Sequence, residues 1–143
     1  MQIQCKRIFN TNGEEKTALG EKNDYLTVGK IYVVLVLYTT EDGVEFQIES
    51  DEGALYILNA TEFEIVSNTI PSNWEITCTH YKEGIYHLRF APKAWNEYKS
   101  YTGDSFYDDI IEVEAPLEQW RNETTKPEVA AVYFQEKDKM SML

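Results

Sequence analysis

A run of eight consecutive apolar residues, Ile31 to Tyr38, most constrains the fold of this chain. The run is rich in β-branched and aromatic side chains, which favour extended backbone. It is far shorter than the ~20 residues that a membrane-spanning helix needs. A continuous apolar run of this length is typical of a strand buried on both faces. We therefore expect one buried strand at 31–38, preceded by a bend at Gly29-Lys30.

Turn signals divide the neighbouring residues into short strands. Asp42-Gly43 is typical of a tight hairpin, because glycine readily adopts the positive φ angle that such turns require. The next six residues alternate between apolar and polar, so the apolar ones are expected to face the core and the polar ones the solvent. The inward set is Val44, Phe46 and Ile48, and the outward set is Glu45, Gln47 and Glu49.

Further short strands are expected at 2–5, 55–58, 62–66, 75–81 and 85–90, the last two joined by a turn at Lys82-Glu83-Gly84. Trp74 and Phe63 are expected in the core. Strands at this spacing predict either a small SH3-like β-barrel or a strongly bent antiparallel sheet.

After Pro92 the spacing of apolar residues becomes that of helices, with Trp95, Tyr98 and Tyr101 on one helical face. A short helical turn is expected at 117–122. Thr125 to Glu128 is typical of a helix start, because it places proline and an acid in the first turn. The apolar stripe of this helix is Val129, Val132 and Tyr133, and the end of the chain, including Lys137 and Lys139, is expected to fray.

These patterns predict an α+β fold that is mainly β, with C-terminal helices. The 143 residues fit one domain, in which 1–90 form the β-rich half and 91–143 a helical appendage. No apolar segment typical of a signal peptide follows the N-terminus. With only two cysteines, Cys5 and Cys78, we expect a cytoplasmic protein whose thiols are reduced and buried.

The charge is strongly negative and unevenly distributed. Twenty-five acids against thirteen bases give a formal charge of −12, which argues against binding to nucleic acid or to an anionic membrane. Residues 41–70 hold eight acids and no lysine or arginine, and residues 101–143 hold ten acids and four bases. Such stretches either bind a basic partner or keep the protein soluble.

Two candidate partner-binding patches follow from this charge distribution. The first consists of acids on expected outward strand faces, Glu45, Glu49, Glu62 and Glu64. The second combines acids with aromatic anchors, Tyr101, Asp104, Tyr107, Asp108, Asp109 and Glu112. The nearby Trp95 and Phe106 are expected to pack in the core instead.

No catalytic motif is present, so we expect neither an enzyme nor a cofactor. A two-residue turn at Glu83-Gly84 would place His80 opposite His87, near Cys78. That set lacks a fourth zinc ligand, and we expect no metal there. Asp104, Asp108 and Glu112 would share one face of a helix, where they could hold Mg²⁺, but a solvated acidic face is the preferred interpretation.

Several segments of residues 1–75 resemble a known family. They are Cys5, Leu26 to Val34, Ser50-Asp51-Glu52-Gly53, Phe63-Glu64 and Pro71 to Trp74. Together they are similar to SH3-like barrels among the immunity proteins of bacterial polymorphic-toxin and contact-dependent growth inhibition systems. The resemblance implies a protein that binds a cognate toxin, here expected to be a basic nuclease-type domain, and neutralises it without covalent chemistry. The alternative is a stand-alone SH3-like interaction or scaffold module that has no toxin partner.

Overall fold

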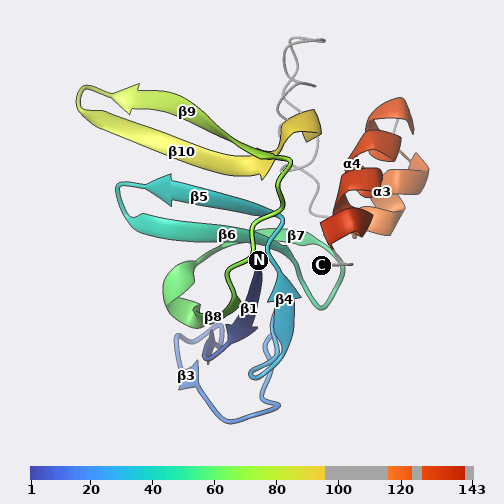
Figure 1. Cartoon of the computed structure of the whole chain (residues 1–143). Helices are drawn as coiled ribbons and strands as arrows, with labels where there is room; N and C mark the ends of the chain where they lie inside the picture. The colour runs from blue at the N-terminus through green and yellow to red at the C-terminus, as the bar shows by residue number, and fades with distance from the viewer. Residues whose placement is uncertain (96–115, 124–126, 141–143) are drawn as a thin grey trace.

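A computed structural model describes residues 1–95, 116–123 and 127–140 (Figure 1). Its strands are β1 (Gln2–Cys5), β2 (Ile8–Phe9), β3 (Glu15–Lys16), β4 (Ile31–Val33), β5 (Val36–Thr40), β6 (Gly43–Glu49), β7 (Leu55–Asn59), β8 (Phe63–Ser67), β9 (Trp74–Lys82) and β10 (Ile85–Pro92). Its helices are the 3-10 turn η1 (Ala60–Glu62) and the α-helices α3 (Leu117–Glu123) and α4 (Pro127–Met140). The α+β class, mainly β, is confirmed.

The described strands form antiparallel sheets that stay open. A three-stranded sheet has the order β4-β1-β8, a five-stranded sheet has the order β7-β6-β5-β10-β9, and β2 pairs with β3. Because neither larger sheet closes on itself, the fold corresponds to the bent-sheet form of the prediction and not to a closed barrel. Two hairpins, β5–β6 and β9–β10, extend from the same side of the molecule (Figure 1).

The prediction of one continuous strand over Ile31–Tyr38 is wrong, because the run crosses between the two larger sheets. Its first part, β4, pairs with β1, whereas its second part, β5, pairs with β6 and β10. The crossing is fixed by two backbone bonds, from Val34 N to Met1 O (3.1 Å) and from Leu35 N to Gln47 O (2.9 Å). Ile31 lies at the start of an edge strand and is 50% exposed.

The first core cluster lies between the three-stranded sheet and one face of the five-stranded sheet. Its fully buried members include Ile3, Cys5, Tyr32, Phe46 and Ile48. Burial raises the pKa of the Cys5 thiol to about 11, so this thiol is protonated and behaves as a small apolar side chain.

The second core cluster lies on the opposite face of the five-stranded sheet, under α3 and α4. Trp95 stacks on Tyr133 with ring centroids 4.5 Å apart, and Trp120 meets Tyr133 edge to face at 6.0 Å. Val36 and Ala91 supply the sheet side of this cluster. The prediction that Trp95 packs in the core is therefore confirmed.

Coverage of both sheet faces corrects the predicted pattern of β6. Phe46 and Ile48 are buried as predicted, but Gln47, predicted to be outward, is only 2% exposed. Val44, predicted to be inward, is 38% exposed because it lies near the end of the β5–β6 hairpin. An alternating strand reveals its apolar face, but it does not reveal whether helices cover the polar one.

Helix α4 begins at Pro127 as predicted, and Tyr133 on its apolar stripe is buried. The expected fraying at Lys137 and Lys139 is wrong, because the helix continues to a buried Met140. Lys137 Nζ lies 2.6 Å from Glu49 Oε2, which ties the last turns of the helix to the end of β6.

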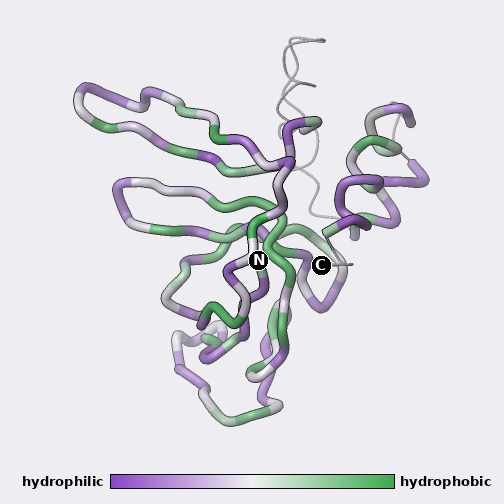
Figure 2. Tube along the Cα trace, in the orientation of Figure 1, coloured by the Kyte–Doolittle hydropathy of each residue, from purple (hydrophilic) through white to green (hydrophobic). Residues whose placement is uncertain are grey.

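Trp74 joins the two cores, because it packs against buried residues of both clusters while remaining half-buried. Phe63, also half-buried, packs against the first cluster. Figure 2 shows the hydrophobic segments gathered where the sheets approach each other and hydrophilic residues at the end of the β9–β10 hairpin.

Candidate interaction surface

The β9–β10 hairpin presents the most exposed apolar strand surface in the described part of the chain. Ile76, Tyr81 and Tyr86 are 59%, 57% and 59% exposed. Cys78 is exposed as well, so the prediction that both cysteines are buried is wrong for Cys78. Ile76 and Tyr86 lie on one face of the hairpin, and Tyr81 lies on the other, beside His87. Large apolar side chains that stay in water on one hairpin are typical of surfaces that bind a partner.

The register of the hairpin follows from its turn and from one bulge. The predicted turn is present in its two-residue form, because Lys82 pairs with Ile85 across Glu83-Gly84. Gly84 has a φ of 76°, which a residue with a side chain seldom adopts. Tyr81 has no partner in the ladder, and this bulge shifts the pairing of the remaining residues by one.

The bulge makes the predicted opposition of His80 and His87 wrong. His80 pairs with Tyr86 and His87 pairs with Thr79, so the two histidines lie on opposite faces of the hairpin. In the described ranges no three His, Cys, Asp or Glu side chains come together in a way that could hold a metal ion.

His87 instead links the two hairpins. Its Nε2 lies 2.6 Å from Glu41 Oε2, and its ring stacks on Tyr81 with centroids 4.7 Å apart and planes inclined by 12°. The hydrogen bond from His87 lowers the pKa of the Glu41 carboxyl. The ends of the β5–β6 and β9–β10 hairpins are therefore held side by side.

The structure does not bring the first predicted patch together as one outward face. Glu45 and Glu49 lie on the face of β6 that the helices cover, and Glu49 is bonded to Lys137. Glu64 on β8 pairs with Lys6 at 2.9 Å, and Glu62 belongs to the 3-10 turn, so the predicted strand face shared by Glu62 and Glu64 is wrong.

The environment of Glu62 differs from that of a solvated acid. Partial burial raises the pKa of its carboxyl, and the nearby Arg7 opposes this shift. The backbone carbonyl of Glu62 accepts hydrogen bonds from Lys6 N at 2.9 Å and from Arg7 N at 3.4 Å. Glu62 therefore helps to join η1 to the segment that follows β1.

The second predicted patch lies outside the described residues. This applies to Tyr101, Asp104, Tyr107, Asp108, Asp109 and Glu112, and also to Phe106. Both patches stay predictions as partner-binding sites.

A polar cluster around Asp51 was missed by the sequence reasoning. The Asp51 carboxylate accepts hydrogen bonds from Thr27 Oγ1 (2.7 Å), Lys30 Nζ (2.6 Å) and Tyr32 OH (2.8 Å). The cluster borders a cavity of about 350 Å³ that Glu49 and Lys137 also line. Since Asp51 and both lysines already have ionic or hydrogen-bond partners, the cluster joins parts of the fold and offers a ligand few free groups.

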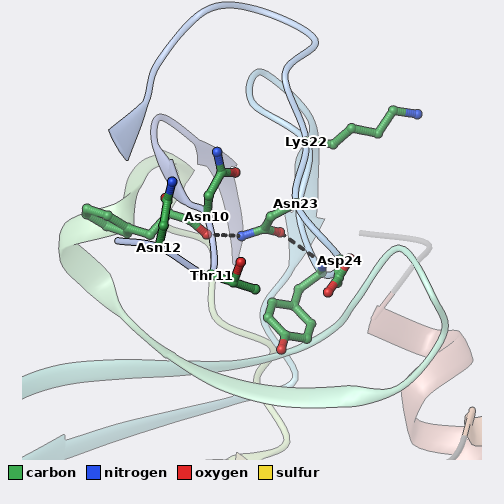
Figure 3. Close-up of a pocket in the computed structure, with 8 residues that line it drawn as sticks. Asn10, Thr11, Asn12, Lys22, Asn23 and Asp24 are labelled. Carbon is green, nitrogen blue, oxygen red and sulfur yellow. Dashed lines mark hydrogen bonds between the residues drawn. The ribbon is translucent and has the colours of Figure 1, made fainter. Parts of the chain in front are cut away.

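A second cavity, of about 560 Å³, lies between the β2–β3 turn and residues 22–25 (Figure 3). Asn23 holds these two loops together: its Nδ2 donates to Phe9 O at 3.1 Å, and its Oδ1 accepts from the backbone N of Tyr25 and Leu26. Lys22 points away from the other labelled residues (Figure 3). Asn23 thus uses its side chain to stabilise the two loops that line the cavity.

Sequence reasoning predicted the hairpin but not its exposure. The alternation of Ile76 and Cys78 with two threonines was a visible signal of a two-faced strand. This alternation did not indicate which strands would pair with the segment.

No helix in residues 1–95, 116–123 or 127–140 is long and apolar enough to cross a bilayer. No protein-family model, curated protein or solved structure matches the chain.

Proposed function

We propose that the protein is an immunity protein that binds a basic toxin domain and neutralises it by non-covalent occlusion. The observation that carries this proposal is that most basic side chains of the described residues form ion pairs within the chain. Within the described residues, ion pairs with acids of the same chain are formed by Lys6, Arg7, Lys16, Lys30, Lys93, Arg121, Lys137 and Lys139.

The acids are in excess, so much negative charge remains without a local counter-charge. Residues 41–92 hold ten acids and two bases. Among the described residues, Asp42 and Glu83 form no ion pair, and both lie in the turns of the two projecting hairpins. The hairpin ends hold three acids, Glu41, Asp42 and Glu83, and one base, Lys82. This net negative charge attracts a basic partner and raises its association rate.

Occlusion fits the surface better than catalysis. The hairpins present aromatic and aliphatic side chains next to acids, a composition that suits an interface core with a charged rim. A basic nuclease cleft carries the positive potential needed for phosphate, and an acidic projection complements that potential.

Protection of growth tests this function. If the reading frame directly upstream of the gene encodes a toxin domain, that domain would be expressed from an inducible promoter in a bacterial host, with and without this protein. We expect growth arrest without the protein and normal growth with it. Continued arrest despite a folded, soluble and abundant protein would refute the function.

Association kinetics test the role of charge. In one variant Asp42 and Glu83 become lysine, and in a control with the same net charge Glu128 and Asp138 on α4 become lysine. We expect the hairpin variant to associate more slowly with the toxin domain and to show a flatter salt dependence than the control. Equal rates for both variants at every salt concentration would mean that the hairpin acids do not face the partner.

A further inference from the structure

Strand β9 is an edge of the five-stranded sheet. It is nine residues long and, among the described strands, pairs only with β10. Natural edge strands are usually short or interrupted by proline, lysine or an inward charge, because an open edge pairs with other chains. From 74 to 82, β9 contains no proline, and its one lysine is the last residue, Lys82.

The hydrogen bonds at the start of the hairpin fix which backbone groups of β9 are free. Lys93 N donates to Asn73 O at 2.8 Å, whereas Trp74 N donates to Pro71 O at 3.1 Å and not to β10. Bonded and non-bonded pairs alternate in an antiparallel ladder. Odd-numbered residues up to Thr79 therefore bond to β10, and the N–H and C=O groups of Ile76, Cys78 and His80 point outward from the sheet edge.

The side chains of these same residues continue apolar rows that begin in the first core. Ile76 pairs with Phe90, which pairs with Leu37, and Leu37 pairs with the buried Phe46. Paired residues in adjacent strands lie on the same face of a sheet. A strand added beside β9 would extend this row, and its side chains would cover Ile76, which is 59% exposed.

We propose that β9 receives an extended segment of a basic partner protein, which adds to the sheet as a sixth strand. The inference rests on the proposed function, because the negative charge of the molecule favours a basic segment as the strand that binds to β9. A second copy of this chain would bring another formal charge of −12 to the same edge. A lysine- and arginine-rich segment would instead meet a net negative charge at the hairpin ends, where Glu41, Asp42 and Glu83 outnumber Lys82.

A proline at position 78 tests the proposal directly. Cys78→Pro removes an outward N–H and leaves the ladder with β10 intact, and Cys78→Ala changes the side chain but keeps the N–H. The probe is a fluorescein-labelled nine-residue peptide of alternating lysine and valine with blocked ends, followed by fluorescence anisotropy. We expect the wild type and the alanine variant to bind equally and the proline variant to bind about tenfold or more weakly.

A second peptide keeps the test valid if the proline variant does not fold, which circular dichroism would show. This peptide has the same sequence but is N-methylated at alternate residues, so it retains its charge and cannot extend a sheet. We expect wild-type protein to bind it at least about tenfold more weakly than the unmodified peptide. Equal binding of both peptides, or of the proline and alanine variants, would overturn strand addition.

Two more readouts separate this inference from the proposed function. If the wild type protects cells from the toxin and a folded Cys78→Pro variant protects equally well, strand addition is wrong and the proposed function stands. If no variant protects, the proposed function fails and the peptide measurements decide the inference alone. A dimer in sedimentation that the proline variant abolishes would overturn the proposal in favour of self-pairing.

Discussion

Replacing Asp51 by alanine tests the polar cluster that joins the β6–β7 turn to the segment 27–32. Asp51 lies in the turn between β6 and β7, and its hydrogen-bond donors come from the segment 27–32. Tyr32 is 4% exposed, and its hydroxyl also accepts a hydrogen bond from Thr27 N at 2.9 Å. In the variant this hydroxyl loses Asp51, the acceptor to which it donates among the described residues. Most of the stability lost in Asp51→Ala is therefore expected to come from the broken hydrogen bond of Tyr32.

The size of the effect follows from the partners. A buried hydroxyl that donates to a charged acceptor contributes about 1.5–3 kcal/mol. The ion pair with Lys30 adds about 0.5 kcal/mol, because the lysine side chain is half exposed. We expect Asp51→Ala to lower the free energy of unfolding by about 2–3.5 kcal/mol, and the melting temperature by about 4–12 °C for a chain of this size.

Urea and thermal unfolding followed by circular dichroism would measure this loss. Asp42→Ala is the matched control: it removes an exposed acid that has no ion pair among the described residues, and it should cost less than about 0.5 kcal/mol. A double-mutant cycle isolates the contact. If the reasoning is correct, Asp51→Ala costs about 1–2 kcal/mol less in a Tyr32→Phe background. Strict additivity of the two changes would refute it.

The Asp51 cluster also makes the stability of the fold depend on pH. Burial alone would raise the pKa of Asp51, but the hydrogen bonds from Lys30, Thr27 and Tyr32 outweigh it and lower the pKa below its ordinary value. The group then stabilises the fold fully above the pKa of the unfolded chain, near 4, and this contribution is lost as the pH falls through the folded pKa. The stability difference between wild type and Asp51→Ala should therefore shrink on acidification below about pH 4. A difference that grows there would contradict this assignment.

Three further outcomes are expected. Lys137→Met, which breaks a 2.6 Å ion pair at a lysine only 17% exposed, should lower stability by more than about 1 kcal/mol in urea unfolding, and Lys6→Met, at a pair exposed on both sides, by less than about 0.5. A strong chelator should leave the melting temperature unchanged, and a loss that zinc reverses would contradict the assignment of the two histidines to opposite faces. Unfolding should occur in one transition by fluorescence and circular dichroism because Trp74 packs against both cores, and two separated transitions would contradict this coupling.

The strands and turns that local signals specify were predictable. Strand β1 occupies the predicted residues, and β9, β10 and α4 begin or end within two residues of their predicted bounds. Glycine at the Asp42-Gly43 and Glu83-Gly84 turns and proline at the start of α4 act through their own backbone preferences. Such signals need no knowledge of the rest of the chain.

Features that depend on distant segments were not predictable from a local pattern. The break inside Ile31–Tyr38 depends on β1 and β6 competing for the same apolar run, and nothing in the run itself marks Val34 and Leu35 as the crossing. The burial of Gln47 depends on helices that follow it by many residues. The pairing of Glu49 with Lys137 has the same origin, which is why a stretch without local bases did not become an unpaired acidic face.

One inserted residue, Tyr81, determines on which face of the β9–β10 hairpin each histidine lies. The predicted turn at Glu83-Gly84 is present, and an unbroken ladder from it would have placed His80 opposite His87, on the face that holds Cys78. The bulge at Tyr81 turns His87 to the other face, where it bonds Glu41 and fastens the two hairpins together. His80 stays beside Tyr86 on the face shared with Ile76 and Cys78. The bulge thus separates residues that could have approached a metal. On one face His87 fixes the end of the hairpin to Glu41, and on the other Ile76, Cys78 and His80 stay exposed beside the open edge of β9, which is the arrangement that strand addition requires.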